Sequence, residues 1–261
     1  MTWTIVILAY AAYLAGVAWL RPTSWTARVA TLAGLVGAAA LQQAPWATAG
    51  PWLRGVLALV SLVAAYQLAG LLFAGPAPWL ERRLAAGDAW LARRLGVPSL
   101  KVTPGLLASL LETSYLLVYP MLPLGAAALY LGGAGAYDDA YWTAVLASGV
   151  ACYGALPWLP SRTPRALEPD APTQGEWTRR ANLAVLGRLS TGVNTVPSGH
   201  AATSTAAALV VAAHVASPVV AAGFVALAAT IAVATVTGRY HYTADTLAGV
   251  LVGALAGALC I

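Results

Sequence analysis

The sequence predicts an all-α protein, a bundle of helices that crosses a membrane many times. Only 9% of its 261 residues are charged, whereas a soluble domain carries roughly 25% charged residues. Long apolar runs rich in Ala, Leu, Val and Gly recur along the chain and are continuous rather than alternating. In lipid only helices or closed barrels satisfy the backbone, and about 20 apolar residues form one spanning helix. The absence of alternation favours helices.

Eight apolar runs are long enough to be spans. The first lacks a basic segment before it and a convincing cleavage site, so we expect it to be retained as a helix. The fourth is too long for one straight span, and we expect Pro120 and Pro123 to kink it or to end its regular part. The predicted spans are about 3–20, 27–45, 52–74, 104–131, 139–158, 198–216, 218–237 and 242–260.

The segment 75–103 between the third and fourth spans differs from the other loops. Arginine pairs alternate in it with Leu and Trp at roughly helical spacing. This pattern predicts an amphipathic helix that lies on the headgroups. The alternative is an ordinary linker next to the membrane.

The charges predict an orientation. Eight crossings place both termini on one side together with Arg54, and thirteen of the 14 cations on the other. Positive loops face the cytoplasm, so we expect an integral, multi-pass protein of the cell (inner) membrane with this basic side inside. The net charge of +5 comes without an aromatic-rich basic domain, so we expect no nucleic-acid partner and favour membrane lipids. The thirteen are Arg21, Arg28, Arg82, Arg83, Arg93, Arg94, Lys101, Arg162, Arg165, Arg179, Arg180, Arg188 and Arg239.

Two short motifs carry the chemistry. In Pro197-Ser198-Gly199-His200 the serine is a good helix cap, and the glycine lets an anion approach the free N–H groups at a helix start. In the second motif Asp245 follows His241 by four residues, one helical turn on the same face. A carboxylate there can bind one imidazole nitrogen and leave the other as a nucleophile. A simple helix tie is the alternative.

About two membrane crossings separate the two motifs, so we expect both histidines at the same membrane face. Two imidazoles and one carboxylate form a workable set for breaking a phosphate ester. The two cysteines, Cys152 and Cys260, fall inside predicted spans and show no metal-ligand spacing. No metal or other cofactor is expected.

These motifs resemble the signatures of the type 2 phosphatidic acid phosphatase (PAP2) superfamily. Pro197-Ser198-Gly199-His200 resembles the second signature, His241 with Asp245 the end of the third, and residues 160–165 the Arg-Pro end of the first. The resemblance covers about residues 52–261. It implies a six-helix catalytic membrane domain over 51–261, preceded by a transmembrane hairpin over 1–50.

The resemblance also implies roles. His241 would take the phosphoryl group, Asp245 would orient it, and His200 would protonate the departing alkoxide and later activate the acceptor. The phosphate oxygens would be bound by Ser198, Gly199 and cations, for which the candidates are Arg162, Arg165 and Arg239.

The chain departs from the family pattern at two positions. Thr235 stands where the third signature has an arginine, and Ala155 stands where the first has a lysine. A His-Tyr-x-x-Asp pattern without that arginine resembles the inositol phosphorylceramide synthase branch. The family resemblance as a whole implies a lipid phosphate phosphatase with a phosphohistidine intermediate, whereas this departure favours a phosphotransferase. The alternatives are a lipid phosphotransferase with an alcohol acceptor and a non-catalytic lipid-binding or transport protein.

Other residues inside the spans complete the expectations. Glu112 is a carboxylate within the fourth span, where it either shapes a polar headgroup pocket with Tyr115 or neutralises an arginine. Gly249, Gly253 and Gly257 repeat every four residues, which indicates close helix packing. The sequence leaves the lipid and the oligomeric state open.

Overall fold

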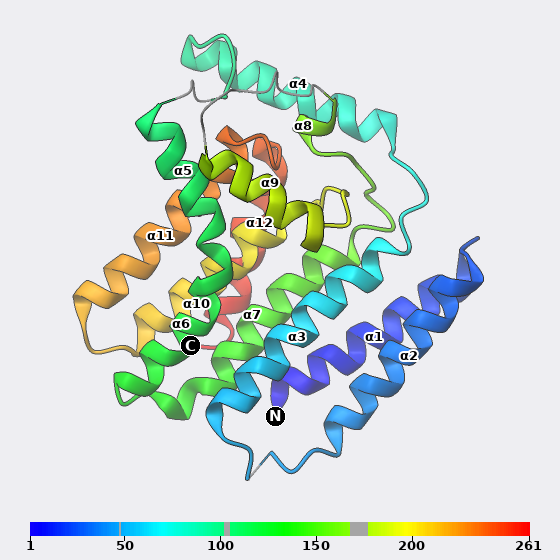
Figure 1. Cartoon of the computed structure of the whole chain (residues 1–261), viewed down its shortest axis with the longest axis vertical. Helices are drawn as coiled ribbons and strands as arrows, with labels where there is room; N and C mark the ends of the chain where they lie inside the picture. Colours follow the sequence, from blue (N-terminus) through cyan, green and yellow to red (C-terminus); the bar gives the residue numbers. More distant parts are fainter. Residues whose placement is uncertain (47, 102–104, 168–176) are drawn as a thin grey trace.

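The computed structural model describes residues 1–46, 48–101, 105–167 and 177–261, and this part of the chain is all-helical. It contains no β-strand, and a single antiparallel bridge joins Ser161 to Asn194. The predicted helical fold class is confirmed (Figure 1). The helices are α1 Thr2–Leu20, α2 Trp25–Gln42, α3 Pro51–Gly70, α4 Pro78–Leu95, α5 Leu106–Leu116, α6 Val118–Leu131, the 3-10 turn η1 Gly135–Tyr137, α7 Asp138–Gly154, α8 Pro164–Leu167, α9 Trp177–Leu189, α10 Gly199–His214, α11 Pro218–Thr237 and α12 Thr243–Ala258.

Each of the eight predicted spans coincides with a long helix or, for the fourth, with a bent pair. Among the described residues, α1, α3 and α11 are long and apolar enough to cross a membrane, and a fourth span is added if the bent pair α5 and α6 counts as one. The 16-residue helices α10 and α12 are each about 24 Å long, against a hydrocarbon core of about 30 Å. Eight crossings therefore stay a prediction.

The fourth span is bent, as the prolines predict. The axes of α5 and α6 differ by 58° at a break around Leu117. Pro120 has no N–H to donate to the carbonyl of Leu116 and its ring crowds that carbonyl, so the helix is interrupted one turn before the proline. The start of this predicted span at 104, like the end of the predicted segment 75–103, lies outside the described residues.

The centre of the bundle is α10, which packs against α6, α7, α11 and α12. Small residues make these contacts close. A side chain at Gly249 of α12 would place its Cβ 2.4 Å from the carbonyl oxygen of Ser198, and one at Gly253 would come within 2.2 Å of that of Ala202. The predicted packing role of these glycines is confirmed, and it sets the start of α10 directly against the first turns of α12.

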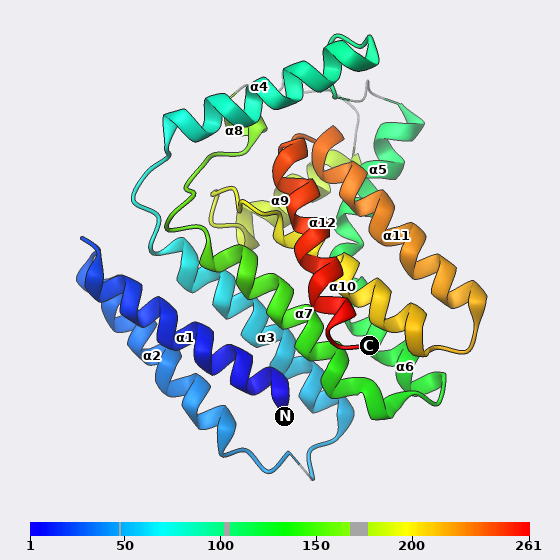
Figure 2. The ribbon, with the colours of Figure 1, turned by 180° about the vertical axis from the view of Figure 1, so that it is seen from behind.

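The N-terminal hairpin of α1 and α2 lies along one side of the bundle, where α1 packs against α7 and α3 (Figures 1 and 2). Trp3 and Leu14 are fully buried there. At the end of the bundle that holds the N-terminus, the Thr2 amide donates to the Asp139 carboxylate at the start of α7.

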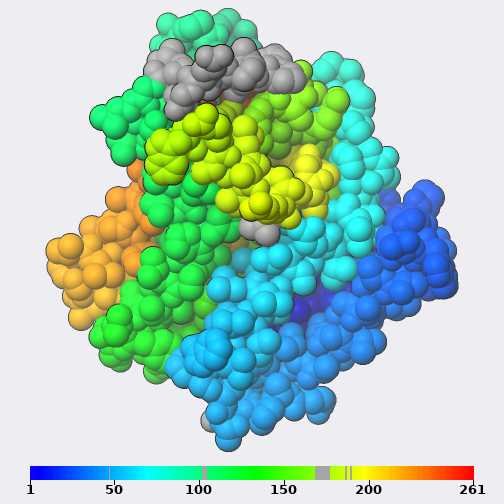
Figure 3. All heavy atoms as spheres, viewed as in Figure 1, coloured from blue at the N-terminus to red at the C-terminus, as the bar shows by residue number. Residues whose placement is uncertain are grey.

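The opposite end is covered by α4 and α9 (Figures 2 and 3). Figure 2 shows α4 lying across this end, over the N-terminal ends of α10 and α12. The predicted helix within 75–103 is therefore present as α4. The space-filling view shows α9 and the loop that follows it, in yellow-green and yellow, covering the bundle between α5 and α3 (Figure 3). No helix was predicted in the region of α9.

Candidate active site

The first motif forms the start of α10. The Ser198 hydroxyl accepts a hydrogen bond from the Ala201 amide and caps the helix, as predicted. The Gly199 amide donates to the Thr195 hydroxyl. His200, in the first turn, then faces the interior of this end of the bundle. Because the cap sets where α10 starts, it also sets the position of His200 in the first turn of the helix.

The second motif forms the start of α12. His241 Nδ1 lies 3.0 Å from Asp245 Oδ2, and Asp245 is fully buried. A carboxylate only accepts hydrogen bonds, so Nδ1 carries the proton and Nε2 keeps its lone pair. The Ser198 amide donates to the Asp245 carbonyl at 2.8 Å, which joins the two motifs directly.

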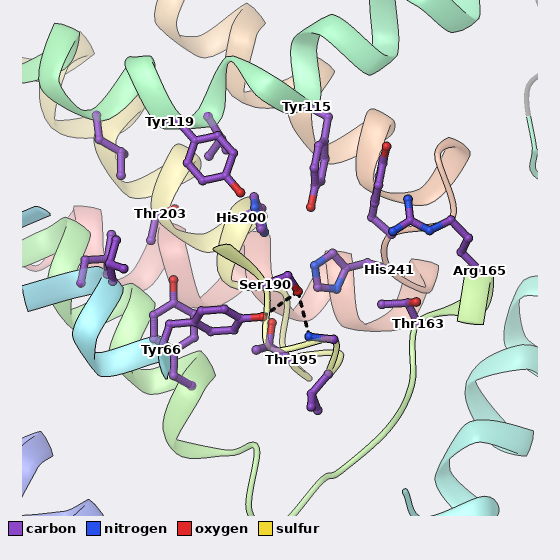
Figure 4. Close-up of a pocket in the computed structure, with 18 of the residues that line it drawn as sticks. Tyr66, Tyr115, Tyr119, Thr163, Arg165, Ser190, Thr195, His200, Thr203 and His241 are labelled. Atoms are coloured by element: carbon purple, nitrogen blue, oxygen red, sulfur yellow. Dashed lines mark hydrogen bonds between the residues drawn. The ribbon is translucent and has the colours of Figure 1, made fainter. Parts of the chain in front are cut away.

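Both histidines line one cavity of about 350 Å³. Their ring centroids are 6.0 Å apart, close enough for both rings to contact one phosphoryl group. Figure 4 shows the two rings in the middle of the cavity, with Tyr115 and Tyr119 on one side and Tyr66, Ser190 and Thr195 on the other. The structure therefore brings His200, His241 and Asp245 together.

Stacked aromatic rings form one wall of this cavity. The Tyr115 ring stacks on His200 with centroids 4.9 Å apart and on Tyr240 at 3.8 Å. Tyr119 meets His200 edge to face at 6.0 Å. Because the His200 ring is held between two tyrosines, its orientation is set by packing.

Arg165 supplies positive charge to the cavity. Its guanidinium lies 4.7 Å over the Tyr240 ring, a cation–π contact. Its Nη1 is buried and has no hydrogen-bond partner among the described residues. A buried N–H donor without an acceptor costs free energy that a bound anion would recover. This is the feature of the cavity most suited to a phosphate oxygen.

The other two predicted cations do not line this cavity. Arg162 donates from its amide, Nε and Nη2 to the Glu81 carboxylate on α4, at 2.9–3.0 Å. Arg239 lines a separate cavity beneath α4 and donates to the Pro164 carbonyl at 3.0 Å. Of the three candidate cations, Arg165 is the one that lines the cavity with the histidines.

Ser198 and Gly199 also lie outside the lining of the cavity. Ser198 is fully buried with its hydroxyl engaged as the helix cap, and a side chain at Gly199 would meet the Tyr153 ring at 2.5 Å. The group that approaches Gly199 closely is the Tyr153 ring, whereas the prediction was a phosphate oxygen. Thr195, Ser190 and Thr163 provide the polar lining instead.

Glu112 lies beside the cavity. Its carboxylate forms a salt bridge with Arg179 and accepts hydrogen bonds from the Asn182 amide and the Tyr240 hydroxyl. Of the two roles expected for Glu112, these contacts match the neutralisation of an arginine, here Arg179. Tyr115 does line the cavity, so the two residues predicted to share a headgroup pocket have different positions.

Asn194 is the residue that the sequence reasoning missed. Its side-chain amide donates to Asp245 Oδ2 at 2.9 Å and to the Ser161 hydroxyl at 3.1 Å. It therefore links the segment that contains Ser161 to the Asp245 carboxylate. The available signal was its place with Thr195 in the polar loop directly before Pro197.

No group of three or more His, Cys, Asp or Glu side chains within the described part of the chain could hold a metal ion. The polar groups of the cavity are instead donors and imidazoles, which suit a phosphate anion.

Comparisons with known proteins add the family. Searches of curated proteins and of solved structures gave no match. A family model described as the PAP2 superfamily matches residues 97–259, which is more than half of the chain and includes both histidine motifs. The chain therefore belongs to the PAP2 superfamily and is an enzyme of the phosphatase type.

Proposed function

We propose that this protein is an integral membrane phosphatase that releases phosphate from a lipid phosphate through a phosphohistidine. The observation that carries the proposal is the pair of histidines in one cavity, with Asp245 on Nδ1 of His241 and the unpartnered Nη1 of Arg165 nearby. These are a nucleophile, an acid and a cationic phosphate contact.

In the first step His241 Nε2 attacks phosphorus while the bond from phosphorus to the lipid oxygen breaks. Asp245 stabilises the positive charge that forms on the ring, and Arg165 stabilises the phosphoryl oxygens. His200 gives its proton to the departing alkoxide. In the second step His200 takes a proton from water, the water oxygen bonds to phosphorus, and the bond from phosphorus to His241 breaks.

The cavity also favours a substrate with an apolar tail. Beyond the histidines its wall is formed by aliphatic side chains of α3 and α6. An alkyl chain there would be removed from water at about 0.8 kcal/mol per buried CH₂. The aliphatic residues of α3 and α6 that line it are Leu59, Leu62, Val63, Val118 and Leu122.

A lipid phosphotransferase is the second candidate. It is favoured by Thr235, which stands where the third signature has an arginine and is fully buried, with its hydroxyl on that of Thr246. The first step would be the same, and an alcohol would replace water in the second.

The test is phosphate release by purified protein from a panel of lipid phosphates with EDTA present. We expect release by wild type and a loss of roughly 10⁴-fold or more in kcat for His241→Ala. His214→Ala is the matched control, because that histidine stacks on Tyr137 at the far end of α10. Full turnover by His241→Ala would overturn the nucleophile assignment. Formation of a phosphorylated alcohol without free phosphate, once an alcohol acceptor is added, would support the transferase.

A further inference from the structure

Helix α4 has an outer face of tryptophan and arginine. Trp79 and Trp90 are 49% and 53% exposed, three helical turns apart. The Arg83 guanidinium lies 5.6 Å over the Trp79 ring, and that of Arg94 lies 5.5 Å over the Trp90 ring. Arg82 and Arg93 are exposed on the same side. Tryptophan and arginine together are typical of helices seated at the headgroups of anionic lipid.

The inner face of α4 contacts all three signature segments. Glu81 binds Arg162 through three hydrogen bonds, and the Arg162 guanidinium holds the pKa of this carboxyl below its usual value. Leu80 and Leu84 pack in one cluster with Val196, which precedes the Pro-Ser-Gly-His motif.

The remaining inner contact is to the catalytic helix itself. Asp88 Oδ1 accepts a hydrogen bond from the Thr243 amide at 2.9 Å, at the first residue of α12. Thr243 lies two residues after His241. The N-terminal end of α12 is therefore held by a side chain of α4.

A continuous path leads from α4 to Asp245. Arg162, held by Glu81, follows Ser161, whose carbonyl and hydroxyl accept from the amide and side chain of Asn194. Asn194 then donates to Asp245 Oδ2 at 2.9 Å. A displacement of α4 would thus reach the carboxylate that orients His241.

The position of α4 in the chain identifies its partner. Residues 71–77 join it to α3, a helix able to cross a membrane, and seven residues extend at most about 25 Å. The segment that follows α4 leads into the bent pair α5 and α6. A helix tied between membrane segments, with four outward arginines, faces the headgroups of the same membrane.

We propose that the outer face of α4 binds anionic lipid headgroups and that this contact sets the position of the three signature segments. The proposal rests on the membrane location in the proposed function. Anionic lipid should then raise turnover by setting the position of these segments.

The experiment compares protein reconstituted in phosphatidylcholine with protein in vesicles where about a third of that lipid is phosphatidylglycerol. Dioctanoyl phosphatidic acid is the substrate, and its mole fraction is varied so that kcat is separated from KM. We expect kcat to rise roughly fivefold or more, the lower end of typical coupling between two sites. Arg83→Gln/Arg94→Gln should abolish the rise and keep the activity in neutral vesicles. Arg180→Gln/Arg188→Gln is the matched control, because both arginines are exposed on α9 at the same end.

A second measurement needs no activity. Quenching by brominated phosphatidylcholine, taken as the difference between wild type and Trp79→Phe/Trp90→Phe, reports the depth of α4. We expect anionic lipid to increase this quenching in wild type and to leave it unchanged in Arg83→Gln/Arg94→Gln. Quenching that responds to anionic lipid without phosphate release would overturn the proposed function alone. The proposal for α4 would be overturned if neither kcat nor quenching of wild type responded to anionic lipid. It would also be overturned if Arg180→Gln/Arg188→Gln abolished the rise in kcat as fully as Arg83→Gln/Arg94→Gln.

Discussion

At the scale of single residues, the site depends on what surrounds Asp245. This carboxylate is fully buried, and its Oδ2 accepts from both His241 Nδ1 and the Asn194 amide. A buried carboxylate stays ionised only where donors replace water. In the proposed mechanism Asn194 therefore holds the carboxylate in place beside the His241 ring.

Asn194→Ala should lower kcat by about 10- to 100-fold, because a hydrogen bond to a charged group contributes about 1.5–3 kcal/mol. Asn194→Asp should cost more, since it places a second carboxylate beside Asp245. Both are measured as kcat of purified protein.

Asn182→Ala is the control for these two variants. Asn182 is an equally buried amide that donates to the carboxylate of Glu112, outside the cavity. We expect it to lower stability without the same loss of kcat. A drop in kcat for Asn182→Ala as large as for Asn194→Ala would mean that Asn194 acts through folding alone.

At the scale of elements, the site is the place where α10 and α12 begin side by side. Gly249 permits this contact, because any Cβ there would meet the Ser198 backbone at 2.4 Å. Backbone atoms cannot rotate away as a flexible side chain can, so α12 or the first turn of α10 must shift.

Gly249→Ala should lower the free energy of unfolding by about 1–3 kcal/mol, as overpacking does, and should also reduce kcat because His200 follows Ser198 by two residues. Thermal unfolding in detergent measures the first effect. Gly223→Ala on α11 is the matched control, since nothing lies within 4 Å of its added Cβ. At Gly223 the substitution should raise the free energy of unfolding by up to about 1 kcal/mol, because alanine forms helix more readily than glycine. Equal melting temperatures for the two variants would refute the packing argument.

At the scale of the whole molecule, charge is divided between the two ends. Arg54 approaches Asp138 at 3.6 Å and Tyr130 at 3.3 Å, at the end that holds the N-terminus. The arginines of α4, α8 and α9 lie at the other end, with His200 and His241. Positive charge on one side predicts that this end, and with it the site, faces the cytoplasm.

The prediction is tested with single cysteines in a Cys152→Ala/Cys260→Ser background. Arg180→Cys should be protected from an impermeant thiol reagent added to intact cells, and Ala136→Cys, exposed near η1, should react. Labelling of Arg180→Cys from outside would place the site on the outer face.

Local patterns predicted much of this fold and part of the site. Apolar run length predicted where the long helices lie. Pro120 and Pro123 together predicted the bend after α5, although Pro123 itself lies inside α6. The spacing of four residues predicted the contact of His241 with Asp245. The helix α9 was not predicted, because its packing against α5 comes from tertiary contacts.

The sequence by itself determined the helical class, the pairing of His241 with Asp245 and the helix cap at Ser198, because each depends on residues within a few turns of one another. Only the tertiary structure decided which arginine lines the cavity. Arg162 and Arg165 lie three positions apart, yet Glu81 binds one and Tyr240 lies under the other. It also decided that Asn194 supports Asp245, 51 positions away. Contacts between distant segments depend on how the helices pack, and a local sequence pattern does not determine this packing.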